Sequence, residues 1–356
     1  MSSLRDIANA LDLSVSMVSK VLSGRMGTSG APAETVRAIR AKAAELNYHK
    51  NVSAAALAAG KSHTVGILIH YLSRIGDLPT REEIVAGQFG IASSSLVEHV
   101  ISGICDGLIA HQMRTVLGFF STPATFERLL PCCNRSELDG IIVVDANEQL
   151  MQQLLEHNSD GLPIVTVHER RNYPELPRVS CDQPAVGELA TRQLLEAGCR
   201  RIMYIGHFQD RYDGYCRALA AAGFDVDPAL VFRERIYYRH QAWELWEKLG
   251  SGFPRQIDGV VAQSDELALG TLQFLQRNGF RVPQQVKIIG VDNSPFCGLL
   301  ETPLSSVDQN IYEVGLTASR QLMKLIRGEE IGNVLIAPML AVRASSSDSN
   351  DITIKP

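Results

Sequence analysis

The short stretch after Ser14 carries side chains whose types and spacing suit contact with nucleic acid. Ser14 can cap a helix in which Val18 and Val21 form a buried stripe. The opposite face then presents Val15, Ser16, Met17, Ser19 and Lys20. First-turn side chains of such a helix reach base edges in the major groove, while serine hydroxyls and lysine bind phosphates or guanine. The pattern predicts a DNA-reading helix.

A second set of residues follows the short buried strands predicted in the rest of the chain. In open parallel sheets, ligands bind beyond the carboxyl ends of the strands, so residues at these points are candidates. The predicted ligand-binding residues are His70, Tyr71, Asp145, Arg211, Asp265 and Asp292, and His168 also ends a predicted strand. Arginine donates hydrogen bonds and a carboxylate accepts them in pairs, which suits neighbouring hydroxyl groups. A single strand-end aspartate is more often a loop cap, but three together favour a site for a small polyhydroxylated molecule, such as a sugar or sugar derivative.

Three short helices are predicted to position the DNA-reading face. Ser3 and Asp6 have the spacing of a capping box at the start of the first helix, and Ser3 is also a candidate DNA contact. Apolar residues repeat at helical spacing from Leu4 to Leu11 and again from Val36 to Leu46. With the DNA-reading helix between these two, we expect an all-α helix-turn-helix domain over residues 1–48.

From His63 onward, short buried strands alternate with helical stretches. The predicted strands are Val65–Ile69, Thr115–Phe120, Gly140–Val144, Pro163–Val167, Arg201–Ile205, Gly259–Ala262 and Val286–Val291. This alternation predicts doubly wound parallel sheets with helices on both faces. We expect an α/β sensor over residues 63–343, built as two lobes. The first lobe is predicted at residues 63–178 plus 308–333, and the second at residues 179–307 plus 334–343.

Three segments are predicted to lie outside the cores of these units. Residues 49–62 are rich in alanine and form a linker that is too short to be a stable helix alone. Residues 344–356 are polar and are expected to form a loose tail. Residues 72–92 look like an inserted loop, which is either a lid over the ligand or a plain surface insertion.

The charge of the chain is unevenly distributed. The 356 residues carry a net −5, but residues 1–62 hold eight Lys/Arg and four acidic residues, a net +4, which leaves −9 for the remainder. A basic head on an acidic body fits a protein that touches DNA with one end. The seven cysteines are odd in number and include no C-x-x-C pair, so neither disulfides nor a metal site is predicted. With no signal peptide and no apolar run near the ~18 residues that cross a bilayer, a soluble cytoplasmic protein with no membrane partner is expected.

The first helices resemble the head of the LacI/GalR family of transcriptional regulators, whose pattern is roughly T-[IL]-x-D-[VI]-A-x-x-[AL]-G-V-S-x-x-T-V-S-R-V-L-N. The identical or conservative matches are Ser3, Leu4, Asp6, Ile7, Ala8, Ser14, Val18, Ser19, Val21 and Leu22. Asp12 stands where the pattern has a turn glycine, and aspartate tolerates this place because it visits left-handed conformations. Met17 replaces Thr, and Lys20 replaces Arg. The resemblance implies that Val15 and Ser16 read bases, with the apolar Val15 favouring a thymine methyl group.

The segment that follows resembles the hinge of the same family, Y-x-P-N-x-x-A-R-S-L. Asn51 and Leu57 match this pattern. The resemblance implies a hinge helix that folds on operator DNA in a homodimer, with Leu57 wedged into the minor groove. Lys50 replaces Pro and Ala55 replaces Arg, so hinge binding is expected to be weaker or less sequence-selective. A plain helical tether is the alternative.

The resemblance extends almost continuously from Asp182 to Gly328. It implies a two-lobed sensor like the periplasmic binding proteins, in which Arg211, Asp265 and Asp292 contact the effector. The sequence therefore predicts a homodimeric transcriptional repressor whose affinity for operator DNA is controlled by a small sugar-like effector. The alternative is a sugar-binding protein or sugar-converting enzyme that carries an accessory DNA-binding head. Because no G-x-G-x-x-G follows the first strand and no P-loop, H-E-x-x-H or nucleophile elbow occurs, neither catalysis nor a cofactor is expected.

Overall fold

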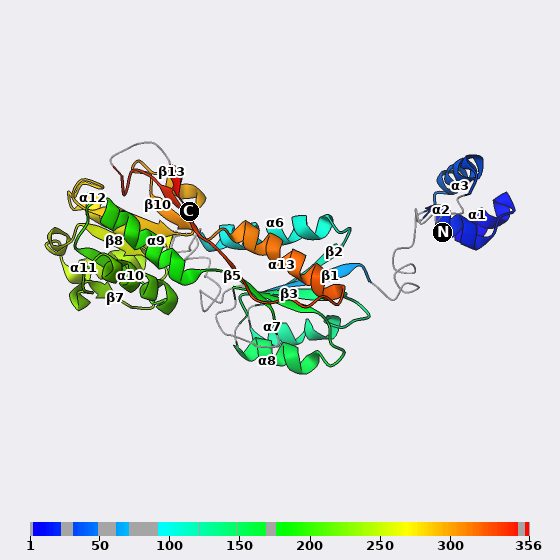
Figure 1. Cartoon of the computed structure of the whole chain (residues 1–356), viewed down its shortest axis with the longest axis horizontal. Helices are drawn as coiled ribbons and strands as arrows, with labels where there is room; N and C mark the ends of the chain where they lie inside the picture. The colour runs from blue at the N-terminus through cyan, green and yellow to red at the C-terminus, as the bar shows by residue number, and fades with distance from the viewer. Residues whose placement is uncertain are drawn as a thin grey trace. The chain divides into compact units, whose positions relative to one another are not determined.

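The computed structural model describes residues 3–22, 31–48, 62–70, 92–120, 122–146, 148–168, 176–347 and 353–355. The chain divides into one compact unit that ends at Ser62 and a second that begins at His63; Figure 1 shows the helices of the first unit in blue. Along the described residues, no helix is both long and apolar enough to cross a membrane.

The first unit is a bundle of three helices, α1 (Leu4–Leu11), α2 (Val15–Leu22) and α3 (Ala33–Glu45). The side chains buried between them are Ile7, Ala8, Val18, Val21, Ile39 and Ala43. The capping box predicted for Ser3 and Asp6 is confirmed, because the Ser3 hydroxyl accepts from the Asp6 amide at 3.3 Å and the Asp6 carboxylate accepts from the Ser3 amide at 2.7 Å. Asp12 ends α1 in the left-handed conformation at φ 50°, as its place in the turn requires.

The first sheet of the second unit has the strand order β11-β5-β4-β3-β1-β2, and all its strands are parallel. Its strands are β1 (Thr64–His70), β2 (Arg114–Phe120), β3 (Gly140–Val144), β4 (Ile164–Val167), β5 (Arg178–Cys181) and β11 (Val334–Ile336). Helices α6 (Ala92–Ile109) and α13 (Ile311–Ile326) cover one face, and α7 (Pro123–Glu127) and α8 (Glu148–His157) cover the other (Figure 1). The central strands are short apolar runs because both of their faces are buried under helices.

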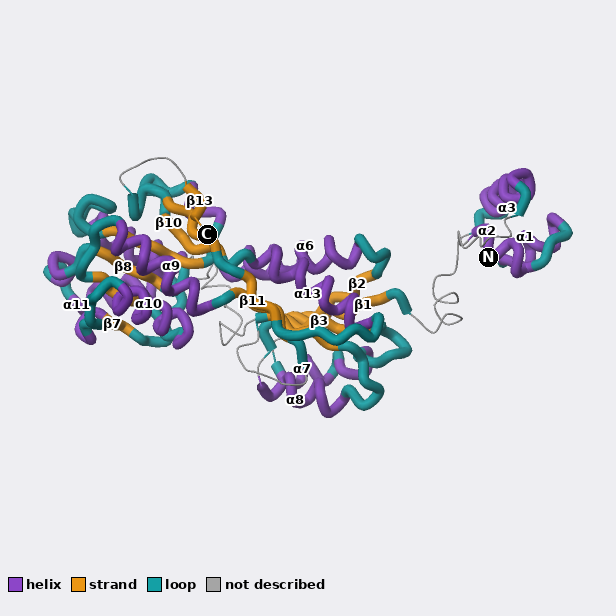
Figure 2. The backbone as a smooth tube through the Cα atoms, viewed as in Figure 1, coloured by secondary structure: helices purple, strands orange, loops and turns teal. Residues whose placement is uncertain are grey.

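The second sheet has the order β13-β12-β10-β9-β8-β6-β7. Its strands are β6 (Ile202–Ile205), β7 (Val231–Phe232), β8 (Gly259–Ala262), β9 (Lys287–Val291), β10 (Ser305–Asp308), β12 (Met339–Val342) and β13 (Thr353–Lys355), of which β12 and β13 are antiparallel to their neighbours. Helices α11 (Arg239–Leu249) and α12 (Asp265–Arg277) pack on one face, and α9 (Gln183–Glu196) and α10 (Gln209–Ala221) pack on the other (Figure 2). The predicted fold class, a helical head with two doubly wound parallel sheets, is confirmed.

The chain passes between the two lobes three times, at residues 182, 309–310 and 337–338, which we call the interlobe segments. The first leads from β5 into α9, the second from β10 into α13, and the third from β11 into β12. The Asp182 amide donates to the Ile336 carbonyl oxygen at 3.0 Å, so the first segment is joined to the end of β11, which leads directly into the third.

Two expected boundaries are wrong. Strand β5 lies wholly in the first sheet and pairs in parallel with β11, so residues 179–181 and 334–336 belong to the first lobe rather than the second. The expectation of a loose tail from residue 344 also fails, because Ser345 and Ser346 are fully buried and β13 pairs with β12. Both errors concern short strands at or near a sheet edge, whose pairing partners lie about 10 to 160 residues away and leave no local periodicity.

Candidate nucleic-acid interface and ligand pocket

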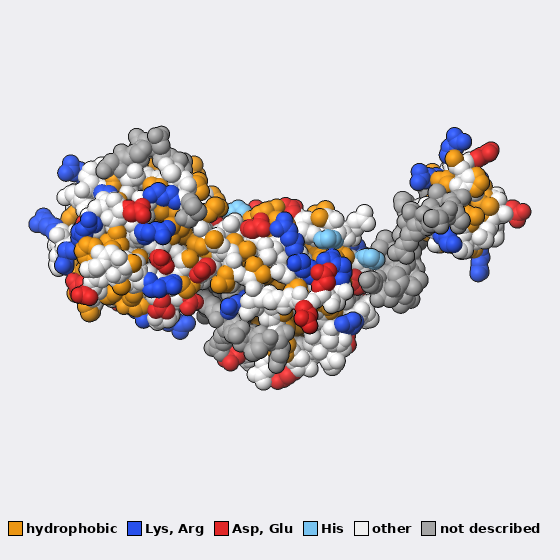
Figure 3. Space-filling model, in the orientation of Figure 1, with side chains coloured by type: hydrophobic (Ala, Val, Ile, Leu, Met, Phe, Trp, Pro, Cys, Tyr) orange, Lys and Arg blue, Asp and Glu red, His pale blue; other side chains and the backbone are white. Residues whose placement is uncertain are grey.

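Helix α2 presents the predicted DNA-reading face to solvent. The Ser14 hydroxyl accepts from the Met17 amide at 3.2 Å, which caps the helix as predicted. Val18 and Val21 are buried, whereas the side chains of Val15 and Met17 are 41% and 36% exposed. Ser14, Ser16 and Lys20 are exposed as well, and Ser19 is half-buried. Lys and Arg side chains of the head are exposed on the face seen in Figure 3.

Three of the predicted site residues lie outside the described residues. These are Asn51 and Leu57 in the hinge and Tyr71 after β1. The inserted loop at residues 72–92 is described only at its last residue.

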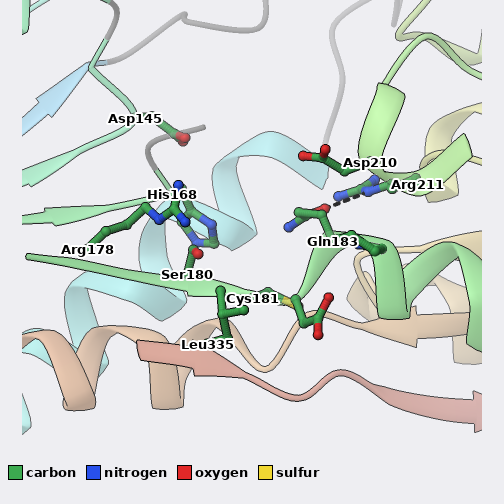
Figure 4. Close-up of a pocket in the computed structure, with 11 residues that line it drawn as sticks. Asp145, His168, Arg178, Ser180, Cys181, Gln183, Asp210, Arg211 and Leu335 are labelled. Atoms are coloured by element: carbon green, nitrogen blue, oxygen red, sulfur yellow. Dashed lines mark hydrogen bonds between the residues drawn. The ribbon is translucent and has the colours of Figure 1, made fainter. Parts of the chain in front are cut away.

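A pocket of about 280 Å³ lies where the carboxyl ends of β3, β4 and β5 meet the starts of α9 and α10 (Figure 4). The residues lining it are Asp145, His168, Arg178, Ser180, Cys181, Asp182, Gln183, Pro184, Asp210, Arg211 and Leu335. In Figure 4, Asp145, His168 and Arg178 lie on one side and Gln183, Asp210 and Arg211 on the other. Both lobes therefore contribute hydrogen-bonding groups of both kinds, as a polyhydroxylated ligand requires.

The first-lobe side of the pocket is shaped by two sharp turns at strand ends. Asp145 after β3 and His168 after β4 have φ values of 56° and 59°. His70 does not line the pocket: its ring donates from Nδ1 to the Asp145 backbone oxygen at 3.1 Å and stacks on Phe120 at 5.2 Å. His70 thus supports the turn that carries the Asp145 side chain.

The second-lobe side is centred on Arg211, whose side chain is only 2% exposed. Its Nε donates to Gln183 Oε1 at 2.8 Å, and an Nη donates to the Gln263 carbonyl oxygen. Helix α10 can bring Arg211 to this place because Gly214 packs against α9: a Cβ there would lie 2.0 Å from the Pro184 oxygen. The three-residue spacing from Arg211 to Gly214 in the sequence is therefore a packing requirement.

Asp265 and Asp292 are not among the residues that line the pocket. Asp265 is fully buried at the start of α12, where its carboxylate accepts from the Ser294 amide at 2.7 Å and from the Ser306 hydroxyl at 2.6 Å. Burial, followed by the nearby charge of Asp292, raises the pKa of Asp265 to about 7. Asp292 in turn accepts from Gln309 Nε2 at 2.5 Å. The described structure gives both carboxylates partners within the protein.

Eight lining residues were not among the predicted strand-end candidates, and some of these left a signal in the sequence. Arg178 and Ser180 alternate along β5, the period that places two side chains on one face of a strand. Asp182 and Gln183 are the first residues of the stretch, Asp182 to Gly328, over which the sequence resembles the family. Asp210 and Cys181 carried no signal beyond their place beside these residues.

Comparison with known proteins finds relatives along nearly the whole chain. Residues 191–346 match the family described as periplasmic binding protein-like domain. The regulator RegA of Clostridium saccharobutylicum is 25% identical over 338 residues, which cover 93% of this chain and 94% of RegA. The regulator CelR of Thermobifida fusca is 29% identical over 340 residues, with 92% and 93% covered. Both are described as HTH-type transcriptional regulators.

Two solved structures resemble this chain over nearly its whole length. A CelR–cellobiose complex superposes with a TM-score of 0.66 and 25% identity over 97% of this chain and all of that chain. The lac repressor dimer bound to operator and the anti-inducer ONPF superposes with a TM-score of 0.73 over 97% of this chain and 99% of that chain. At 18% identity, the second likeness bears on the fold alone.

Proposed function

This chain belongs to the LacI/GalR family of transcriptional regulators, and we propose from this premise that it is a repressor whose operator affinity is set by a small polyhydroxylated effector. The observation that carries the proposal is the capped helix α2, which buries Val18 and Val21. Its opposite face exposes both apolar and polar side chains to solvent, namely Val15, Ser16, Met17 and Lys20. The regulators RegA and CelR match this chain over 93% and 92% of its length, so the match includes residues of the head. A regulator that binds the chromosome acts in the cytoplasm.

On DNA, the roles of the α2 residues follow from their chemistry. Val15 and Ser16, in the first turn, are the proposed base readers, and Lys20, in the last turn, is a proposed phosphate or guanine contact. Ser14 and Ser19 flank them and are proposed phosphate contacts. A homodimer presents two such helices to half-sites about one helical turn apart.

The first-lobe sheet offers a surface for the second copy of the chain. Strand β2 is at the sheet edge, and its Val116, Leu117 and Phe119 side chains are 53%, 45% and 51% exposed. An apolar edge strand that stays open is an aggregation hazard, so soluble proteins cover such edges. We assign this edge to the homodimer.

Effector control follows from a pocket that both lobes line. A ligand bound by Asp145 of the first lobe and Arg211 of the second favours the lobe arrangement in which both can reach it. If that arrangement differs in operator affinity, the effector changes DNA binding, and DNA changes effector binding by the same factor.

The proposal is tested with the purified full-length protein in two steps. Selection from random DNA duplexes should enrich a near-palindromic sequence. A selection without enrichment would overturn the proposal that this protein is a sequence-specific regulator. Cellobiose, D-ribose and D-gluconate, with further sugars, sugar phosphates and nucleosides, are then screened by thermal shift, since a ligand of the folded state raises the melting temperature. The sugar that binds should change operator affinity, and Arg211→Met should abolish its thermal shift. An effector that binds without changing operator affinity would refute the coupling.

The enzyme alternative has no support of its own. Within the described residues, no three His, Cys, Asp or Glu side chains gather as a metal would require. The relatives carry the names of regulators. Appearance of product from any sugar that binds would revive this alternative.

A further inference from the structure

A continuous row of hydrogen bonds runs from the pocket arginine to the half-buried carboxylate of Asp292. Arg211 Nε donates to Gln183 Oε1 at 2.8 Å, a bond drawn in Figure 4. Gln183 Nε2 donates to Gln309 Oε1 at 2.7 Å, and Gln309 Nε2 donates to Asp292 Oδ1 at 2.5 Å. All three bonds point the same way, from cation to anion.

The two ends of this row fix the orientation of both amides. A guanidinium has no acceptor, so the Gln183 atom that faces Arg211 must be its oxygen. The amide nitrogen of Gln183 then faces Gln309, whose near atom must also be an oxygen. Gln309 is left with its nitrogen facing the Asp292 carboxylate, which can only accept while ionised. No other arrangement satisfies every bond.

The row also joins separate parts of the backbone. Gln309 lies in the second interlobe segment and is fully buried, and Gln183 directly follows the first. The first segment is also tied to the end of β11, directly before the third segment, by the backbone bond from Asp182 to Ile336. The first two crossings between the lobes are therefore bonded to each other through Gln183 and Gln309, and through Gln183 to the arginine that lines the pocket.

We propose that Gln183 and Gln309 are positioning residues that form a directional latch, which couples the orientation of Arg211 to the arrangement of the interlobe segments. Movement of the segments past one another breaks the row, and Arg211 then loses the acceptor that orients its Nε. A ligand held by Arg211 thereby favours the latched arrangement. The link to an effector rests on the proposed function, but the latch itself exists or fails without any ligand.

Because all hydrogen bonds of the latch run in one direction, a carboxyl group at position 309 should fit the latch only when it is protonated. In Gln309→Glu, an ionised carboxylate would face Asp292 and repel it. Once protonated, the carboxyl group of this variant would instead reproduce the glutamine, because its carbonyl accepts from Gln183 and its hydroxyl donates to Asp292. Burial and the facing carboxylate both favour the protonated form, so it should dominate in mild acid. The other charges near this place are Asp308 at the end of β10, Asp182 in the first segment, Asp265 beside Asp292, and Arg211.

The first experiment measures thermal unfolding of the full-length protein and its variants at about pH 8 and about pH 5.5. Gln309→Met, which keeps the volume but no hydrogen bond, should melt about 5 °C below the wild type at both values. Gln309→Glu should melt below Gln309→Met at pH 8 and above it at pH 5.5. Adding Asp292→Asn to Gln309→Glu should restore the melting temperature at pH 8, because the carboxylate then has donors on both sides. The control Gln273→Glu makes the same change at an exposed glutamine of α12 and should follow the wild type.

The second experiment observes Arg211 directly. In protein labelled with ¹⁵N-arginine, the Nε–H signal missing from Arg211→Lys identifies the residue. This signal should shift in Gln309→Met and in Gln309→Glu at pH 8, and return in Gln309→Glu at pH 5.5. The latch is overturned if the melting temperatures of the two Gln309 variants differ by the same amount at both pH values. It is also overturned if the Arg211 Nε–H signal has the same chemical shift in these variants as in the wild type. No ligand enters either measurement, so a failed effector screen and a failed latch are distinguishable.

Discussion

Replacement of Asp265 by asparagine should stabilise the sensor at alkaline pH and remove part of its pH dependence. Burial, with the nearby charge of Asp292, raises the pKa of this carboxyl from 3.8 to about 7 in the folded protein. Because the folded state holds the proton more tightly than the unfolded state, stability falls as the pH rises from about 4 to about 7 and is level above that range. The difference between the two pKa values, at about 1.36 kcal/mol per pH unit, corresponds to a cost of about 4 kcal/mol at pH 8.

Asparagine can occupy this place without losing either hydrogen bond. Its side-chain oxygen can accept from the Ser294 amide, as Asp265 does at 2.7 Å. Its amide nitrogen can donate to the Ser306 oxygen, which the carboxylate now meets at 2.6 Å. The substitution therefore removes the charge that opposes folding, and it replaces with a donor one of the two acceptor oxygens that Ser294, Ser306 and the Cys297 thiol now share.

The assay is urea unfolding of the wild type, Asp265→Asn and the exposed control Asp225→Asn at about pH 5.5 and about pH 8. Since about 1.5 pH units separate 5.5 from the raised pKa, the wild type should lose about 2 kcal/mol more than Asp265→Asn over this interval. Asp225→Asn should behave as the wild type does. Equal pH dependence in the wild type and Asp265→Asn would refute the reasoning.

Four further outcomes are expected. Ser3→Ala removes the cap of α1 and should cost the head about 1 kcal/mol in thermal unfolding; an unchanged head transition would contradict the capping role. Lys20→Ala should weaken binding to all duplexes alike and lower the salt slope by about 1 in anisotropy titrations, whereas an altered sequence preference would make Lys20 a base reader. Phe119→Asp should give monomers in analytical ultracentrifugation, and a retained dimer would exclude the β2 edge. Gly214→Ala places a Cβ 2.0 Å from the Pro184 oxygen and should cost about 1 to 3 kcal/mol in urea unfolding, so full stability would show that α10 can move away freely.

The parts of the fold that sequence predicts are those with local causes. The cap at Ser14 and the stripe of Val18 and Val21 are set within one helix, and six of the seven predicted strands are apolar runs buried on both faces, the exception being the edge strand β2. Strands β5 and β11 were missed because each is short and is stabilised by a partner far along the chain.

The ligand pocket was predicted less well, and for a physical reason. A residue at the carboxyl end of a strand is near the pocket, but the direction of its side chain depends on the turn that follows. Asp145 points to the pocket, while Asp265 begins a helix and turns inward to Ser294 and Ser306. Both are aspartates near the carboxyl end of a strand, Asp145 directly after β3 and Asp265 three residues after β8, and the three-dimensional structure separates their roles.

The three interlobe segments also determine how such a protein can be recombined. Each lobe is assembled from separate stretches of the chain, so exchanging one lobe between relatives needs three junctions placed at once. The head is joined to the sensor by a single junction near Ser62. Gene fusion can therefore exchange the DNA specificity of this protein in one step, whereas its ligand specificity has to change by substitutions within an intact sensor.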